Sequence, residues 1–248
     1  MVSRDESSFR SYKVSFGPSL TPAIRGLIIA NVAIHLLQFL AGREATIMIQ
    51  DLFALDPNRV VSATPWLWQP LTYMFLHHPG DIMHILFNML MLWMFGGDLE
   101  QRWGAGRFLR FYAVCGYGAG LVTVAVNVLL KIDTPTIGAS GAIFGLLAAF
   151  GMLFPNRTVL FMMLFPMRAR TMVILFAVLQ LWAVGGFQRT GIAYFAHLGG
   201  MLVGWLYLSG WWDPRRLVAE VRWKLRRRKF KTLQGRGKGH DEERFPFH

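Results

Sequence analysis

Two polar residues in apolar surroundings suggest hydrolytic chemistry. Ser140 lies in the sequence Gly-Ala-Ser-Gly, and His197 lies in Ala-His-Leu-Gly-Gly. An ionisable side chain at membrane depth costs roughly 2.5–3.5 kcal/mol on insertion scales, so His197 marks a functional site whose partner should be sought. A serine hydroxyl becomes a good nucleophile when a neutral imidazole about 2.6–3.2 Å away accepts its proton. The two residues are therefore predicted to form a catalytic dyad.

No carboxylate is predicted to complete a triad. The nearest acidic residues lie at the ends of the expected membrane spans, and they are Asp81, Asp98, Asp133 and Asp213. Acyl transfer also needs donors aimed at the developing oxyanion, each worth roughly 2.7–4 kcal/mol in the transition state. His84 and Asn88 are four residues apart and share one helix face. With the backbone N–H of Ser140, which is near a helix start, they are predicted to form an oxyanion hole.

The composition indicates which kind of scaffold must position these side chains. The chain has 248 residues, of which 54% are hydrophobic and 16% are charged, and its mean hydropathy is +0.37. A soluble domain carries about 25% charged residues, so an integral membrane protein is predicted. Spans of about 20 apolar residues recur along the chain. We expect an all-α, polytopic bundle with six spans, at 22–41, 82–97, 107–130, 138–154, 170–187 and 191–212.

Three regions are expected around these spans. Residues 1–21 form a cytoplasmic N-terminal segment in which no cleaved signal peptide is evident, 22–212 form one membrane domain, and 213–248 form a basic cytoplasmic tail. Loop 42–81 is rich in proline and tryptophan, which indicates a segment lying in the membrane interface. The single cysteine, Cys115, excludes an internal disulfide.

The distribution of charge predicts the orientation. Most of the net charge of +12 lies in the tail, directly after a hydrophobic span, which favours contact with anionic lipid headgroups over nucleic acid. The positive-inside rule places both termini in the cytoplasm and requires an even number of spans. Spans two, four and six then run from outside to inside. His84, Asn88, Ser140 and His197 are thereby expected at similar depth, in the outer half of the membrane.

Glycines are predicted to bring the two catalytic helices together. Gly138 and Gly141 let the backbone approach the nucleophile. Gly141 with Gly145, and Gly200 with Gly204, form faces of small residues that permit close helix contact. Spans four and six are therefore expected to pack against each other, as a hydrogen bond between Ser140 and His197 requires.

Several motifs in this order resemble those of the rhomboid intramembrane serine proteases. They are Phe75-Leu76-His77, His84-x-x-x-Asn88, Gly96-Gly97, Glu100-x-Arg102-x-Gly104 with Gly106, Gly138-x-Ser140-Gly141 and Ala196-His197-x-x-Gly200-x-x-x-Gly204. The resemblance implies a six-helix core, Ser140 as nucleophile, His197 as base, and His84, Asn88 and the Ser140 amide as oxyanion donors. It also implies cleavage of single-span membrane proteins near the outer face of a bacterial plasma membrane, with small residues at the cut.

The chain departs from this family in two places. The Trp-Arg pair that some members carry in the first long loop is absent, because Trp66 and Trp68 have no adjacent arginine. Phe144 stands where some relatives have a tyrosine beside the catalytic histidine, so it can stack on His197 but cannot donate a hydroxyl. His77 is expected to form a hydrogen bond within the loop and to shape the entrance of the active site.

Alternative interpretations remain at this point. Taken alone, the Gly-Ala-Ser-Gly segment is typical of helix packing, and a catalytically inactive rhomboid-like protein that binds membrane proteins and directs their folding or traffic is the main rival function. A transporter is disfavoured because no intramembrane carboxylate is present to couple ions. His77, His78 and His84 lack the spacing of a metal motif, so no metal or other cofactor is expected. Glu100 and Arg102 are assigned to a structural polar network, His35 is assigned to packing, and the sequence does not indicate an oligomeric state.

Overall fold

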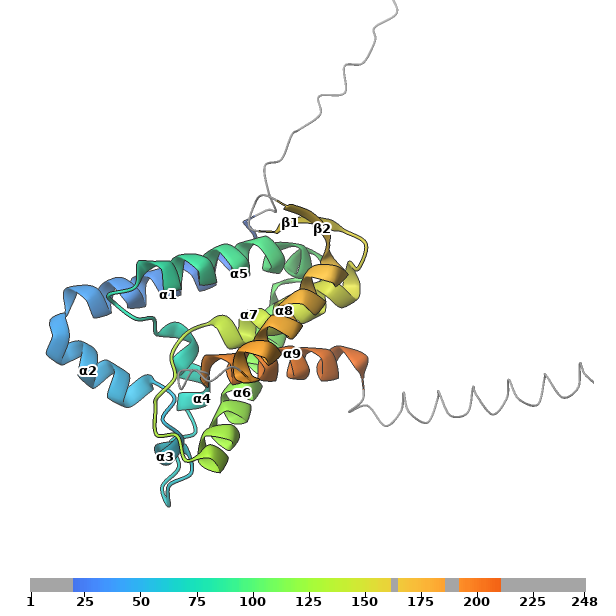
Figure 1. The fold of residues 1–248 in the computed structure, drawn as a ribbon. Coiled ribbons are helices and arrows are strands. Elements are labelled where there is room, and N and C mark those ends of the chain that lie inside the picture. Colours follow the sequence, from blue (N-terminus) through green and yellow to red (C-terminus); the bar gives the residue numbers. More distant parts are fainter. Residues whose placement is uncertain (1–19, 162–164, 186–191, 211–248) are drawn as a thin grey trace, which may run out of the picture. The chain divides into compact units, whose positions relative to one another are not determined.

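The computed structural model describes residues 20–161, 165–185 and 192–210 (Figure 1). The basic tail and nearly all of the N-terminal segment lie outside the described residues. The chain divides into two compact units, residues 1–204 and 205–248, and the candidate site lies entirely in the first. The elements are α1 Pro22–Leu40, α2 Gly42–Phe53, α3 Pro57–Val60, α4 Gln69–Thr72, η1 Tyr73–Phe75, α5 Ile82–Trp103, α6 Ala105–Leu130, α7 Ser140–Leu153, β1 Thr158–Phe161, β2 Phe165–Arg168, α8 Ala169–Gly185 and α9 Ile192–Ser209.

The helices follow the predicted spans. Within the described residues, α1, α5 and α6 are long and apolar enough to cross a membrane, and α7 and α8 are shorter apolar helices. Helix α5 continues past the span end predicted at residue 97 to Trp103, and within it Gly96 packs its bare backbone against Ile24. The helix ends at Gly104, whose φ of 77° is a conformation that glycine adopts readily.

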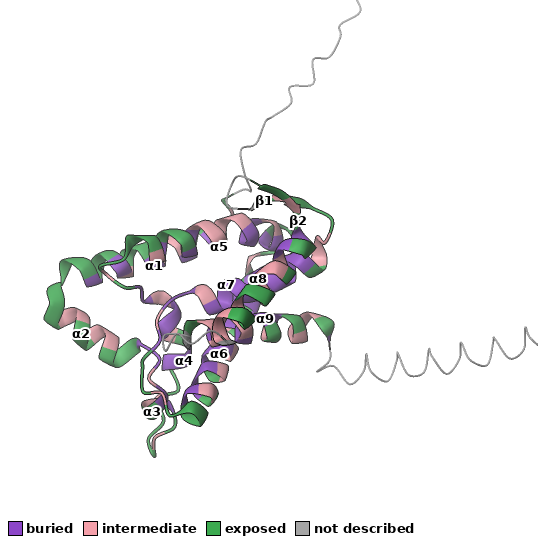
Figure 2. Cartoon of the chain, in the orientation of Figure 1, coloured by how far each residue is buried: buried purple, intermediate pink, exposed green. Residues whose placement is uncertain are grey.

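Helix α7 is the core of the first unit. Every residue from Gly141 to Gly151 is buried, as the purple ribbon in Figure 2 shows. Helices α5, α6 and α8 pack around it. A helix that is apolar on all sides belongs in a protein interior, so the first residue of α7, Ser140, is held by a rigid element.

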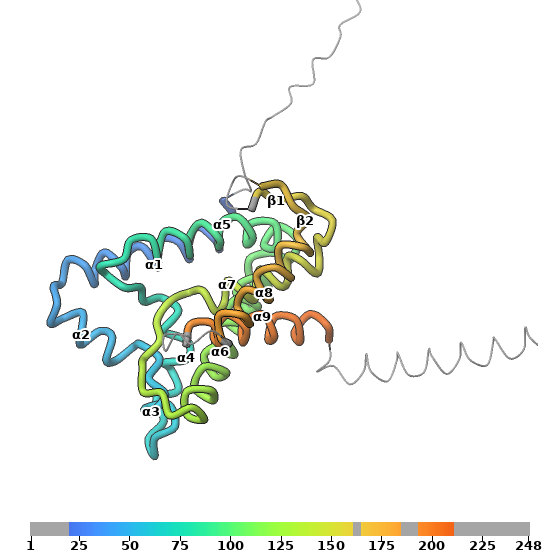
Figure 3. The backbone as a smooth tube through the Cα atoms, in the orientation of Figure 1, coloured from blue at the N-terminus to red at the C-terminus, as the bar shows by residue number. Residues whose placement is uncertain are grey.

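The long loop between α1 and α5 fixes the approach to α7. Figure 3 traces the backbone from the end of α6 back past this loop to the start of α7. Leu55 and Thr136 exchange two backbone hydrogen bonds of 3.0 Å, and the N–H of Gly138 donates to the carbonyl of Tyr73 over 2.9 Å. Backbone hydrogen bonds at Thr136 and Gly138 therefore hold the segment that leads to Ser140.

The folded loop brings an arginine onto a tryptophan ring, although no Trp-Arg pair is adjacent in the sequence. The guanidinium of Arg59 lies 4.4 Å from the centre of the Trp66 ring, and Trp66 stacks on Trp68 with 5.0 Å between ring centres. Arg59 also pairs with Asp51 and Asp56. A cation over an indole face is attracted to its negative quadrupole, so this contact stabilises the loop.

A short antiparallel hairpin joins α7 to α8, where the sequence analysis expected only a loop. Thr158 pairs with Arg168 and Phe161 pairs with Phe165. Arg157, just before the first strand, forms a 2.9 Å ion pair with Asp98 of α5. The hairpin was not predicted because neither strand alternates polar and apolar residues and the second contains Pro166, which argues against a strand.

Glu100 has structural contacts, as the sequence suggested, but it does not share them with Arg102. Glu100 is 3% exposed, and its carboxylate accepts hydrogen bonds from the N–H groups of Ala23 at 2.9 Å and Ile24 at 3.0 Å and from the Thr21 hydroxyl. It therefore caps the positive N-terminus of α1. Arg102 instead lies over the ring of Phe154, at 5.8 Å.

We expect Glu100→Ala to lower the free energy of unfolding by about 2–4 kcal/mol, because two buried N–H groups lose their acceptor. Thermal unfolding in detergent, followed by circular dichroism, measures the effect. Glu44→Ala is the matched control, since Glu44 is exposed on α2. Equal stability of the two variants would contradict the capping role.

Candidate active site

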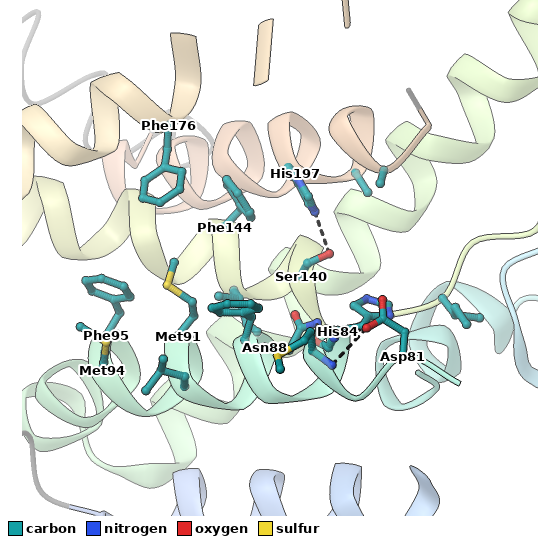
Figure 4. A pocket seen from close by; sticks show the side chains of 18 of the residues that line it. Asp81, His84, Asn88, Met91, Met94, Phe95, Ser140, Phe144, Phe176 and His197 are labelled. Carbon is teal, nitrogen blue, oxygen red and sulfur yellow. Dashed lines mark hydrogen bonds between the residues drawn. The ribbon is translucent and has the colours of Figure 1, made fainter. Parts of the chain in front are cut away.

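Ser140 and His197 lie within hydrogen-bond distance. Ser140 is the first residue of α7 and His197 lies on α9, and Ser140 Oγ is 2.8 Å from Nε2 of the imidazole (Figure 4). This separation is within the range in which an imidazole can accept a hydroxyl proton. The structure thus brings together the nucleophile and the base proposed from the sequence.

Gly138 shapes the backbone immediately before Ser140. Its φ is 122°, a conformation that residues with a side chain rarely adopt. A Cβ atom at this position would lie 2.8 Å from Nε2 of His84. The bare glycine therefore allows both the turn into α7 and the close approach of the His84 ring.

Helices α7 and α9 touch backbone to backbone. A Cβ atom on Gly200 would lie 1.9 Å from the carbonyl oxygen of Gly141, and one on Gly204 would lie 2.8 Å from that of Gly145. The two faces of small residues identified in the sequence therefore meet each other. This contact sets the separation of the backbones that carry Ser140 and His197.

An aromatic ring fixes the plane of the imidazole. Phe144, one helical turn after Ser140, stacks on His197 with 4.1 Å between ring centres and 7° between planes. Phe176 of α8 meets Phe144 edge to face, at 5.9 Å. Stacking on one face restricts the rotation of His197, so Nε2 stays directed at the serine.

The proposed oxyanion donors lie at the start of α5. Asp81 caps this helix by accepting from the N–H groups of Met83 at 3.1 Å and His84 at 3.2 Å. Asn88 donates one amide hydrogen to the carbonyl of His84 over 2.7 Å. That bond orients the Asn88 amide, whose second hydrogen stays available for another acceptor.

These residues line one cavity of about 680 Å³ between α5, α7, α8 and the first part of α9. His84, Asn88, Ser140 and His197 lie along one part of its wall. Figure 4 shows that the other part is apolar, with Met91, Met94, Phe95, Phe144 and Phe176. The cavity therefore places a nucleophile beside a surface suited to apolar side chains.

His77 is fully buried beside the site. Its ring lies 5.0 Å from that of His84, edge to face, and its backbone N–H donates to Gln38 at 3.4 Å. Burial, together with the neighbouring His84 and His35, lowers the pKa of His77 to about 3. His77 is therefore neutral at physiological pH and packs against His84, a proposed oxyanion donor.

Gln180 of α8 was missed by the sequence analysis. Its Oε1 lies 2.9 Å from Nδ1 of His197, on the opposite side of the ring from Ser140. Only carboxylates were expected as a third group, whereas an amide oxygen also accepts a hydrogen bond. A lone glutamine in the apolar run of α8 was the signal available in the sequence.

The comparisons with known proteins identify the family of the chain. Residues 65–212 match the Rhomboid domain, which is more than half of the chain. The chain belongs to the rhomboid family. Rhomboid protein 1 of Saccharomyces cerevisiae mitochondria is 36% identical over 155 residues, which are 58% of this chain and 44% of that protein.

Two other rhomboid relatives broaden the comparison. Rhomboid protease GluP of Bacillus subtilis is 31% identical over 152 residues, which are 61% of this chain and 27% of that protein. RHOMBOID-like protein 1 of Arabidopsis thaliana is 30% identical over 230 residues, which cover 81% of this chain and 54% of that protein. The chain thus spans about a quarter to a half of these relatives. The family supports a helical integral membrane protein, as the sequence predicted, and the match covers α5 to α9, which carry the candidate site.

Proposed function

We propose that this rhomboid protein is a serine endopeptidase that cleaves single-span membrane proteins in or near their transmembrane segment. The observation that carries the proposal is the 2.8 Å contact between Ser140 Oγ and His197 Nε2 in a largely apolar cavity. A name such as rhomboid protease, which a Bacillus subtilis relative bears, points in the same direction. The chemistry would be acyl transfer to serine, with no cofactor.

In this mechanism His197 accepts the hydroxyl proton as Ser140 attacks the scissile carbonyl. The negative charge that develops on the carbonyl oxygen is stabilised by the Ser140 N–H, the second amide hydrogen of Asn88 and the His84 ring. His197 then protonates the leaving amine, and an acyl-enzyme remains. A water molecule deprotonated by His197 attacks the ester carbonyl and releases Ser140 and the second product.

The substrate class follows from the surroundings of the nucleophile. Apolar side chains line most of the cavity, so it suits an apolar segment of a membrane protein. The peptide must unwind locally, because a hydrogen-bonded helix hides its scissile carbonyl. From the resemblance to rhomboid proteases we also expect small residues at the cleavage position. Membrane lipids are the other expected partners of the protein.

The orientation is part of the proposal. The positive-inside rule places both termini in the cytoplasm and opens the active site to the outer face. We keep the bacterial plasma membrane as the proposed location. The relatives come from a yeast mitochondrion, a plant and a bacterium, so they do not single out that membrane.

The decisive test is a fluorophosphonate that reacts with activated serines, applied to the purified protein in liposomes together with a single-span model substrate. We expect Ser140 to be the labelled residue by mass spectrometry, and we expect one defined cut that Ser140→Ala abolishes. The control is Ser62→Ala, since Ser62 lies in the loop away from the site. Wild-type protein that neither cleaves nor takes the label would favour the inactive, binding-protein alternative.

A further inference from the structure

Gln180 extends the Ser140–His197 pair into a chain of three groups. Its Oε1 lies 2.9 Å from Nδ1 of His197, while Nε2 of the same ring lies 2.8 Å from Ser140 Oγ. Each group comes from a different helix, since α7 carries the serine, α8 the glutamine and α9 the histidine. The packing of α8 beside α9 therefore determines whether Gln180 reaches the His197 ring.

The chemistry of an amide oxygen decides which ring nitrogen holds the proton. A carbonyl oxygen only accepts hydrogen bonds, so Oε1 requires a proton on Nδ1 of the neutral ring. Nε2 then presents its lone pair to the Ser140 hydroxyl. The other tautomer would direct an N–H from Nε2 at Ser140 and leave Oε1 facing a second lone pair. Only the first arrangement allows His197 to accept the serine proton.

Stacking and hydrogen bonding have separate effects on this ring. Phe144 fixes its plane but does not distinguish the two nitrogens, because an aromatic face offers no acceptor in the plane of the imidazole. Gln180 supplies that distinction. In a serine protease triad the acceptor behind the base sets its tautomer, and the wrong tautomer can cost about 10⁴-fold in rate.

We propose that Gln180 is a positioning residue, which holds His197 in the tautomer that accepts the Ser140 proton. The inference rests on the proposed serine protease function for its kinetic consequence. Its structural consequence, the location of one proton, does not depend on catalysis. The two consequences are therefore tested by separate measurements.

The structural test is ¹⁵N NMR of histidine-labelled protein in lipid, with the His197 signals assigned by their loss in His197→Asn. We expect protonated Nδ1 and unprotonated Nε2 in the wild type. Gln180→Met has a similar volume and removes the acceptor, so it should shift His197 toward the Nε2–H form. Gln180→Glu retains an acceptor oxygen and should keep the wild-type tautomer. Leu181→Met, next to it on an exposed face of α8, is the matched control.

The kinetic test is the rate of fluorophosphonate labelling of Ser140. We expect Gln180→Met to lower the maximal labelling rate about 10-fold or more, with the half-saturating concentration changed less than about 2-fold, because proton transfer is impaired and binding is not. Gln180→Glu should restore the rate to within about 3-fold of the wild type. A purely structural role would affect both variants and alter their unfolding.

The outcomes separate the two proposals. Wild-type tautomer and wild-type labelling in Gln180→Met would overturn the positioning role and leave the protease assignment intact. A wild-type protein that takes no label would overturn the protease assignment, and the NMR measurement would still decide whether Gln180 sets the tautomer. Loss of the Nδ1 proton in Gln180→Met but not in Gln180→Glu would support the inference.

Discussion

Replacing His197 with alanine is expected to lower cleavage of a single-span substrate by at least about 10⁴-fold, and combining it with Ser140→Ala is expected to lower it no further. In the proposed mechanism the two residues act as one unit through their 2.8 Å contact, so removing either one removes the activated nucleophile. Single-turnover cleavage in liposomes, with products resolved by mass spectrometry, measures all three variants. Any residual rate would come from binding and the oxyanion donors alone.

The matched control for this experiment is His78→Ala. His78 is an exposed histidine in the loop before α5, and its side chain contacts the backbone of Gly80. We expect cleavage close to that of the wild type. A His197→Ala variant that retains a tenth or more of the wild-type rate would show that another group deprotonates Ser140, and the proposed dyad would be wrong.

The sequence predicted the helical scaffold well because the membrane imposes one dominant physical requirement. Spans must be apolar and their backbones must be internally hydrogen-bonded, so hydropathy locates α1, α5 and α6 directly. Helix α5 extends beyond the predicted span 82–97 to Trp103, because hydropathy locates the apolar part of a helix and not its polar end. Within α5, the missing side chain of Gly96 provides space for Ile24.

The core of the candidate site was predictable because its residues are polar in apolar surroundings. Ser140 and His197 are each placed by a local motif, and the glycines beside them indicate close packing. Gln180 was missed because a single glutamine has no local partner in sequence, and only the packing of α8 beside α9 brings it to Nδ1. Arg59 and Trp66 likewise meet only through the turn of the loop.

Among glycine-to-alanine substitutions at the contact between α7 and α9, Gly200→Ala is expected to lower the free energy of unfolding most. The new Cβ would lie 1.9 Å from the backbone oxygen of Gly141, where no side-chain rotation can relieve the overlap. Helix α9 must therefore move away from α7, at a cost of about 3 kcal/mol or more. Thermal unfolding in detergent measures this loss. Gly26→Ala is the control, because its Cβ would meet nothing within 4 Å on α1.

The cleavage rate of Gly200→Ala is expected to be low even for molecules that are fully folded. A displacement of the helix backbones lengthens the distance between Ser140 and His197, and a misplacement of about 1 Å can cost about 10²-fold in rate. The cleavage rate of Gly200→Ala should therefore stay low at temperatures at which the variant is fully folded. Wild-type activity per folded molecule would mean that the dyad tolerates a wider helix separation. The contact between Gly141 and Gly200 would then serve folding alone, and the geometry of the dyad would have to be set by Phe144 and Gln180.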